Sequence, residues 1–242
     1  MKKYIAMIPA RFGSQRLKLK NLALINGKPL IYYAIQAALE SKLFYKIVLN
    51  SDNEIFKKIA DKYNIDFYLR PKKFGSSKTS SDEVIYDFIK KYQSADFISW
   101  INPIAPLQTS KDIIDCTKYF NKEKLDSLIT VNEYSLHGMY KKSPINYNKF
   151  NKFARTQDLN KIELFLYSTM IWKCETFLAA YKKRKSAIFC GKFSTFPIPR
   201  ERSLLIKNQE DLKLANLIFY SQNNKKFENK LKLRYDSIIK KI

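Results

Sequence analysis

The segment YIAMIPARFGSQRLKLKN, residues 4–21, decides the fold because it joins a continuous apolar run to a short cationic loop. The apolar run, 4–9, predicts a strand that is buried on both faces. The loop after it places Gly13 and Ser14 among the cations Arg11, Arg16 and Lys20. At the carboxyl end of a buried strand, such a loop offers backbone N–H groups and fixed positive charge to a phosphate.

Outward from this segment, short apolar runs alternate with helical patterns. The predicted strands are 4–9, 46–49, 66–69, 97–101 and 127–131, and the predicted helices are 29–40, 54–63, 81–92 and 110–121. This alternation is typical of βαβ units, so we expect an α/β protein with three layers, α/β/α, around a mostly parallel sheet. Ligands of such sheets bind beyond the carboxyl ends of the strands, here in the loops 10–21, 50–53, 70–81 and 102–109.

The alternation fails after residue 132, where Tyr, Asn, Ser and Lys dominate around Pro144. We interpret 133–170 as an inserted arm within a single domain, 1–242, and the sheet pattern resumes at 164–172. A helix is expected from Glu175 and a last one from near Asn208. Apolar residues recur at helical spacing in 222–242, which predicts a C-terminal amphipathic helix that packs on its own domain.

Charge and composition narrow the function classes. The chain has 45 Lys and Arg against 22 Asp and Glu, a net charge of +23, yet only 8 of the cations are Arg. Base readers and phosphate clamps favour Arg, so a solvated basic surface is the preferred interpretation and no specific nucleic acid is expected. Attraction to an anionic membrane surface through the cluster 182–185 stays open. Without an apolar run long enough to span a bilayer, we expect no integral membrane contact and a soluble, cytoplasmic protein.

Several chemistries are excluded by residue counts and motifs. His137 is the single histidine, and the three cysteines, Cys116, Cys174 and Cys190, form no CxxC pair, so zinc hydrolases and Ser/His/Asp triads are excluded. The first loop is neither GxxxxGKS/T nor GxGxxG, which argues against a P-loop kinase and a Rossmann dehydrogenase. The cationic loop alone is a weak signal of function.

The combined motifs are more specific. Several segments are similar to the motifs of one family and occur in the same order along nearly the whole chain. They are 10–30 (family pattern ARxGSKxxxxKN, then GKPL), 49–52 (VSTD), 76–81 (SDTASS) and 102–108 (QPTSPLR). Further landmarks are Arg70-Pro71, the run 155–158 and the run 210–212. The chain thereby resembles the acylneuraminate cytidylyltransferase (CMP-sialic acid synthetase-like) family. This resemblance implies a nucleotidyltransferase fold whose arm crosses to a second subunit, and therefore a homodimer.

The resemblance implies CTP and a sialic acid-like 2-keto sugar acid as substrates. It assigns nucleotide contacts to Arg11, Gly13, Ser14, Gln15, Lys20, Asn21, Arg70, Ser80 and Ser81. It assigns sugar-acid contacts to Asn102, Arg155 and Gln157, and catalysis to Arg11 and Lys20. Two further catalytic candidates come from their charge: Arg16, which is adjacent to the loop position of Gln15, and Lys207, whose ammonium would bring positive charge to the phosphoryl oxygens. The implied reaction transfers CMP from CTP and releases pyrophosphate for surface glycan biosynthesis.

Some of these residues have a structural alternative. Ser80 with Glu83 three residues on fits a capping box, so Ser80 is expected at a helix start with or without a ligand. Capping is the preferred interpretation for Asp211, three residues after Asn208. Arg70 before Pro71 could be an ordinary surface cation. For Arg11 and Lys20 the phosphate role is preferred, because the loop brings their charges together where phosphate binds.

The chain departs from the family pattern most at Leu205-Ile206-Lys207, where relatives carry Asp-Ile-Asp as magnesium ligands. An alkyl group and an ammonium supply no oxygen donor, so no protein metal ligand is assigned and any Mg²⁺ is expected on the nucleotide phosphates. Gln15 also replaces the loop Lys, with Arg16 adjacent. A second hypothesis is therefore a degenerate member that binds a nucleotide or a partner without turnover. A third, non-specific nucleic-acid binding, rests on charge alone.

Overall fold

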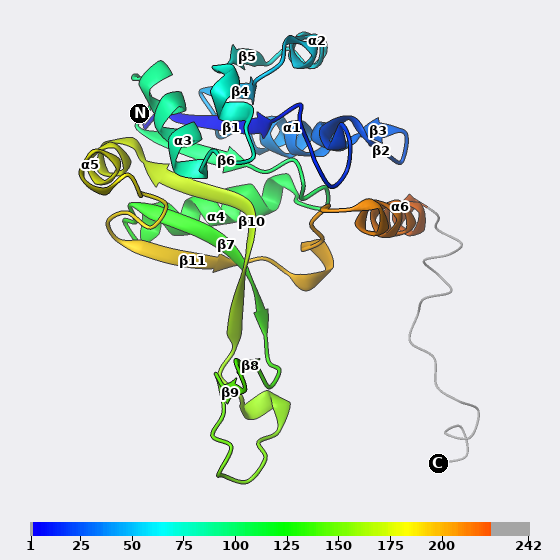
Figure 1. Cartoon of the computed structure of the whole chain (residues 1–242), viewed down its shortest axis with the longest axis vertical. Helices are drawn as coiled ribbons and strands as arrows, with labels where there is room; N and C mark the ends of the chain where they lie inside the picture. Colours follow the sequence, from blue (N-terminus) through cyan, green and yellow to red (C-terminus); the bar gives the residue numbers. More distant parts are fainter. Residues whose placement is uncertain (1, 224–242) are drawn as a thin grey trace.

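A computed structural model describes residues 2–223 and shows a seven-stranded sheet covered by helices on both faces (Figure 1). In spatial order the strands are β11 (Phe193–Pro197), β7 (Ser127–Tyr134), β10 (Ile162–Lys173), β6 (Phe97–Ile101), β1 (Tyr4–Ala10), β4 (Lys46–Ser51) and β5 (Asp66–Leu69). All neighbouring pairs are parallel except those of β10, which runs antiparallel to both β6 and β7. The predicted mostly parallel, three-layer fold is confirmed.

Of the six described α-helices, the first five divide between the two faces because each buries one apolar stripe against the sheet, and the sixth packs through Ala215 with Ile25, Leu30 and Ile206. They are α1 (Leu30–Ser41), α2 (Lys57–Lys62), α3 (Ser81–Lys91), α4 (Ser110–Lys122), α5 (Cys174–Arg184) and α6 (Gln209–Asn223). Side chains of α3 and α5 form one buried cluster with Ile5, Met7 and Trp172. Side chains of α1, α2 and α4 pack on the opposite face with Ala6 and Ile8. Alternate residues of β1 thus enter different cores, as a doubly covered strand requires.

Short elements connect these layers. They comprise the 3₁₀ turns η1 (Lys20–Leu22), η2 (Glu54–Phe56), η3 (Lys72–Gly75), η4 (Thr156–Asp158) and η5 (Arg200–Arg202), and the two-residue strands β2 (Leu24–Ile25), β3 (Lys28–Pro29), β8 (Met139–Tyr140) and β9 (Ser143–Pro144). The helix predicted over 54–63 is in fact η2 followed by α2. Strand β11 was not predicted, since it is short and ends at Pro197.

Part of the segment predicted as an arm forms a projection of β7 and β10, which carries β8 and β9 beyond the long strands and ends in a loop (Figure 1). The two long strands pair outward to Tyr134 and Ile162, and their register shifts between Phe165 and Met170. The predicted boundary 133–170 is too long at its C-terminal end, because 166, 168, 169 and 170 are buried in the body of the domain. The projection itself exposes many apolar side chains: Leu136, Met139, Tyr140, Ile145, Phe150 and Phe153.

The last described helix, α6, begins where the sequence predicts it. Asn208 Oδ1 accepts a hydrogen bond from the Asp211 backbone N–H, and Asp211 Oδ2 accepts one from the Asn208 N–H, so the capping interpretation of Asp211 is confirmed. The amphipathic helix predicted over 222–242 lies outside the described residues from 224 onward. None of the helices within 2–223 combines the length and apolar character that crossing a bilayer needs.

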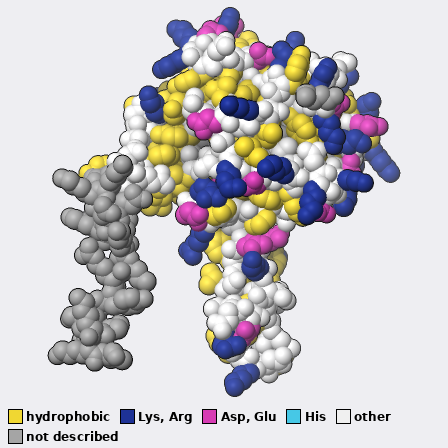
Figure 2. All heavy atoms as spheres, turned by 180° about the vertical axis from the view of Figure 1, so that it is seen from behind, with side chains coloured by type: hydrophobic (Ala, Val, Ile, Leu, Met, Phe, Trp, Pro, Cys, Tyr) yellow, Lys and Arg dark blue, Asp and Glu magenta, His cyan; other side chains and the backbone are white. Residues whose placement is uncertain are grey.

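On the face shown in Figure 2, the positively charged side chains do not form a single patch. Figure 2 shows Lys and Arg side chains spread over one face of the body, interspersed with acidic and apolar side chains. A groove that tracks a nucleic-acid backbone would need its cations gathered along one line. On this face the arrangement favours the solvated-surface interpretation of the net charge of +23.

Candidate active site

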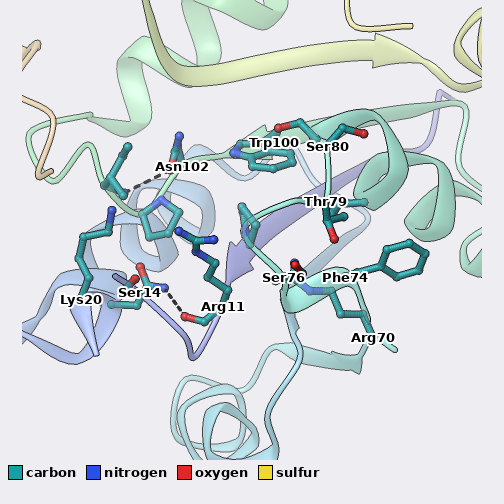
Figure 3. Close-up of a pocket in the computed structure, with 16 residues that line it drawn as sticks. Arg11, Ser14, Lys20, Arg70, Phe74, Ser76, Thr79, Ser80, Trp100 and Asn102 are labelled. Atoms are coloured by element: carbon teal, nitrogen blue, oxygen red, sulfur yellow. Dashed lines mark hydrogen bonds between the residues drawn. The ribbon is translucent and has the colours of Figure 1, made fainter. Parts of the chain in front are cut away.

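A pocket of about 220 Å³ opens at the carboxyl ends of β1 and β6, the edge at which ligands of parallel sheets bind (Figure 3). Three segments of the chain form its walls. They contribute Pro9, Arg11, Ser14, Lys20 and Asn21; Arg70, Phe74, Ser76, Thr79, Ser80, Ser81 and Val84; and Trp100, Asn102, Pro103 and Ile104. The volume is below ~300 Å³, the lower end for ligand pockets, so a ligand as large as a nucleoside triphosphate must extend beyond it over the open first loop.

The first wall is the loop after β1. It brings Arg11, Ser14 and Lys20 together, as predicted (Figure 3). Asn21 anchors the loop from η1, since its buried side-chain amide donates to the Arg11 carbonyl oxygen at 3.5 Å. The amide oxygen of Asn21, Oδ1, is buried and has no hydrogen-bond partner among residues 2–223. An unpaired acceptor at the wall of a pocket is available to a ligand donor.

Among the cations of the first loop, Lys20 has a pKa that its surroundings change. Burial lowers its pKa to about 8, and repulsion by Arg16 and Arg11 adds to this effect, while Asp211 opposes it. Placing Lys20 close to Arg11 and Arg16 therefore costs electrostatic free energy, and an anion in the pocket would offset that cost. Perturbed ionisable groups in a cleft are typical of functional sites.

The second wall contains Arg70, whose interpretation as a surface cation is wrong. Its side chain is only 4 % exposed, and Nη2 lies 3.5 Å from Asp52 Oδ1. Burial lowers the pKa of Arg70, and the nearby carboxylate of Asp52 opposes that shift. The Nε–H of Arg70 is buried and has no acceptor in the part of the chain that the structure describes. Arg70 thus offers the pocket both charge and a free donor.

Asp52 also holds the neighbouring turn. A Cβ on Gly75 would lie 2.2 Å from Asp52 Oδ2, so only glycine permits this close approach of η3.

Ser80 caps the start of α3, as predicted. Its Oγ accepts from the Glu83 N–H at 3.3 Å, and Glu83 Oε2 accepts from the Ser80 N–H at 2.8 Å, which is a complete capping box for α3. The hydrogen bonds that the Ser80 N–H and hydroxyl donate to the carboxylate lower the pKa of Glu83. Ser80 and Ser81 nevertheless line the pocket. The Ser80 hydroxyl also donates to Glu83 Oε2 at 2.9 Å, so a ligand at this wall meets a Ser80 hydroxyl that is already paired and the exposed Ser81 side chain.

Other predicted residues lie outside the pocket. Gly13, Gln15 and Arg16 belong to the first loop but do not line the cavity. Arg155 and Gln157 are exposed on the arm, where Arg155 Nε is paired with Asp158 Oδ2 at 2.8 Å. Because the arm projects from the body (Figure 1), one chain does not bring these two residues to Asn102.

Lys207 lies beside the pocket without lining it. The preceding residue, Ile206, is buried, and its N–H donates to the carbonyl oxygen of the pocket residue Ile104 at 2.8 Å. Lys207 itself is exposed, and its backbone N–H donates to Asp211 Oδ2 at 2.7 Å. The segment 205–207 therefore borders the cavity, with the Lys207 side chain open to solvent.

The described residues do not fit a protein-held magnesium ion. Within 2–223, no cluster of three or more His, Cys, Asp or Glu side chains could hold a metal. Asp211 Oδ2 accepts from two helix-start N–H groups, and Asp52 Oδ1 accepts from Phe12 N–H at 3.1 Å and faces Arg70. A hard cation needs several free oxygen donors converging on one point.

Sequence reasoning missed part of the lining: Pro9, Phe74, Ser76, Thr79, Val84, Trp100, Pro103 and Ile104. Trp100 looked like an ordinary residue of a buried strand. A signal was present, since Trp100 lies two residues before Asn102 and strand side chains alternate between faces.

A three-layer sheet with a cationic pocket at the carboxyl ends of its parallel strands defines a class: the α/β proteins that bind phosphorylated ligands at this edge. Within that class, residues 5–230 match the family model described as Cytidylyltransferase, and the chain belongs to this family.

Relatives with named activities support this family. The chain is 30% identical over 241 residues to N-acylneuraminate cytidylyltransferase of Escherichia coli O18:K1:H7, covering 93% of this chain and 54% of that protein. It is 30% identical over 234 residues to pseudaminic acid cytidylyltransferase of Campylobacter jejuni subsp. jejuni serotype O:2, covering 90% and 96%. The chain spans about half the length of the neuraminate relatives from Escherichia coli and Streptococcus agalactiae, 54% and 56%.

Solved structures agree on the fold. A CMP:2-keto-3-deoxy-manno-octonic acid synthetase complexed with CTP superposes with a TM-score of 0.69 at 13% identity, covering 91% of this chain and 100% of that one. A 4-diphosphocytidyl-2C-methyl-D-erythritol synthase from Anaerococcus prevotii superposes with a TM-score of 0.66 at 15% identity, covering 90% and 99%.

Proposed function

We propose that this chain transfers CMP from CTP to an oxygen of a sialic acid-like 2-keto sugar acid and releases pyrophosphate, for surface glycan biosynthesis. One observation carries the proposal most directly. In a chain of the cytidylyltransferase family, Arg11 and Lys20 converge beside Ser14 at the end of β1, where burial, together with repulsion by Arg16 and Arg11, lowers the pKa of Lys20 to about 8. A triphosphate is the ligand whose charge relieves this crowding.

The nucleoside of CTP is assigned to the second wall. Arg70, Ser80 and Ser81 line it, and Asn21 faces them from the first loop. The unpaired acceptor of Asn21 and the unpaired Nε–H of Arg70 suit a base edge that both donates and accepts hydrogen bonds. Gly13 and Gln15 lie at the open side of the first loop, where the part of the triphosphate beyond the cavity would rest.

The sugar acid is assigned to Asn102 together with Arg155 and Gln157 of a second copy. The arm carries both residues away from its own pocket, and it exposes Phe150 and Phe153 as well as several aliphatic side chains. A projection this apolar is typical of a surface that another subunit covers. The proposal therefore includes a homodimer in which each arm completes the partner's site.

In this reaction an oxygen of the sugar acid attacks the α-phosphorus in line, and the bond from that phosphorus to the bridging oxygen of pyrophosphate breaks. The leaving pyrophosphate takes up the electron pair of that bond, and the proton of the attacking hydroxyl passes to water. Arg11 and Lys20 would hold the phosphates in position and offset the charge that develops on them. Arg16 from the first loop and Lys207 from the bordering segment would add charge at the open side.

Mg²⁺ enters the proposal as a counter-ion carried by the nucleotide phosphates, since the described side chains do not fit a protein site. We also propose a cytoplasmic location, because Cys116, Cys174 and Cys190 are all buried, unpaired thiols.

The absence of carboxylates at 205 and 207 favours a second candidate: a degenerate member that binds the nucleotide or a partner without turnover. Pyrophosphate release separates the two. CTP, UTP, GTP and ATP would each be offered with N-acetylneuraminic acid, pseudaminic acid and 3-deoxy-manno-octulosonic acid, with and without Mg²⁺. Release with CTP and one of these acids supports the transferase. Calorimetric binding of CTP without release in any combination supports the degenerate member. If the chain neither releases pyrophosphate nor binds CTP, both candidates are contradicted.

A further inference from the structure

Trp100 is a pocket residue to which the proposed reaction gives no role. It lies in β6, level with Met7 of β1 on one side and Met170 of β10 on the other. Its indole lines the pocket and lies between Asn102 and Ser80 (Figure 3).

The backbone aims Trp100 and Asn102 at the same space. Although β6 ends at Ile101, the N–H of Asn102 still donates to the Ser168 carbonyl oxygen of β10 at 2.8 Å. Strand geometry therefore continues through Asn102, and residues two apart in a strand project from the same face. Ile101 between them is buried in the core on the opposite face.

Both side chains offer a hydrogen-bond donor to the pocket. The indole Nε1–H of Trp100 is buried and has no acceptor among the described residues. By contrast, Nε1 of Trp172 donates to the Ile188 carbonyl oxygen at 2.8 Å, as a buried indole normally does. Asn102 Oδ1 accepts a hydrogen bond from the Ile104 N–H at 3.4 Å, so this oxygen faces the loop that follows β6. The side-chain NH₂ group of Asn102 is then the donor that remains for a ligand.

We propose that Trp100 is a specificity-determining residue for the sugar acid, its indole N–H and the Asn102 amide donating as a pair to an oxygen of that substrate. This proposal rests on the proposed function. Two neutral donors suit a hydroxyl or carbonyl oxygen, whereas the phosphates have the charged Arg11 and Lys20 on the first wall. An analogue without that oxygen would leave a buried N–H unpaired, which is how sites of this kind discriminate.

The substitution Trp100→Phe keeps an aromatic ring and removes the donor. We expect the KM for the sugar acid to rise about tenfold, equal to about 1.4 kcal/mol, while the KM for CTP stays within about twofold. Trp172→Phe is the matched control, because it removes an indole N–H in the core and leaves both KM values unchanged. An unchanged sugar-acid KM in Trp100→Phe, or a raised KM for CTP alone, would overturn the assignment.

A second readout does not require turnover. The chain has two tryptophans, so Trp172→Phe leaves Trp100 as the single indole emitter. With CDP saturating, N-acetylneuraminic acid, pseudaminic acid or 3-deoxy-manno-octulosonic acid should change that emission. Emission that responds to CDP and to none of the three acids would overturn the Trp100 assignment. If an acid changes the emission although the wild type releases no pyrophosphate, the transferase proposal fails and the Trp100 contact stands.

Discussion

Oδ1 of Asp52 lies 3.5 Å from Nη2 of Arg70, and this buried pair joins the end of β4 to the end of β5 at the pocket wall. The same oxygen accepts a hydrogen bond from the Phe12 N–H of the first loop at 3.1 Å. Asp52 does not line the pocket, yet it fixes two of the segments that do. The position of the site therefore depends on a carboxylate behind it.

Asp52→Ala should destabilise the protein by on the order of 3 kcal/mol, because it removes the paired carboxylate of the buried Arg70 guanidinium and leaves only the more distant Asp87 as a counter-charge. The free energy of unfolding in urea measures the effect. Asp66→Ala is the control: its partner is Lys46, both side chains are 41–45 % exposed, and the loss should stay below about 1 kcal/mol. If both variants lose the same free energy of unfolding, the Asp52–Arg70 pair contributes no more to stability than the exposed Asp66–Lys46 pair.

Binding of CTP should take up a proton near pH 8 to 9. In the free protein the pKa of Lys20 is about 8, so much of this side chain is neutral there. The triphosphate favours the ammonium and raises that pKa, so affinity should fall as pH rises above about 8 and level off below about 7. Calorimetry in HEPES and in Tris gives the proton uptake from the difference in heat.

Lys20→Ala should abolish this proton uptake and weaken CTP binding by about 1 to 3 kcal/mol, and Arg11→Ala should weaken binding by a similar amount without abolishing the uptake. Lys28→Ala, an exposed cation outside the pocket, is the control. Heats that do not depend on the buffer in the wild type would refute the role of Lys20.

Restoring two carboxylates next to the pocket should increase the dependence on metal. In the double variant Leu205→Asp with Lys207→Asp, we expect pyrophosphate release to require Mg²⁺ more strongly than in the wild type, since two oxygen donors then flank the buried Ile206. Lys207→Ala should lower the rate more than the affinity for CTP. A wild-type rate that a chelator abolishes and Lys207→Ala leaves intact would remove Lys207 from catalysis.

Removing the arm should give a monomer. Tyr134 and Ile162 are paired across β7 and β10, so replacing 135–161 by Asn-Gly closes the hairpin with a two-residue turn and leaves the body intact. Sedimentation should show a dimer for the wild type and a monomer for the variant. The variant should bind CTP and lose turnover with the sugar acid. A variant that still sediments as a dimer would place the interface elsewhere.

The sequence by itself determined the layers and the first wall of the pocket. Apolar runs and helical periods indicate which face of each element is buried. Because this information is local, the order of strands and helices could be predicted up to residue 131. The loop 10–21 follows a strand directly, and the position of Arg11, Ser14 and Lys20 at the carboxyl edge follows from chain continuity. The same reasoning found the capping box of Ser80, since its partners are three residues apart.

Tertiary structure alone decided how distant segments meet. The antiparallel insertion of β10 between β6 and β7 and the addition of β11 at the edge depend on long-range pairing, which no local period encodes. The burial of Arg70 depends on Asp52, which follows another strand, and the indole N–H of Trp100 is unpaired because the fold brings no acceptor from residues 2–223 to it. Arg155 and Gln157 lie on a projection that leaves the body, so their distance from Asn102 is set by the direction of the arm and not by the motif that contains them.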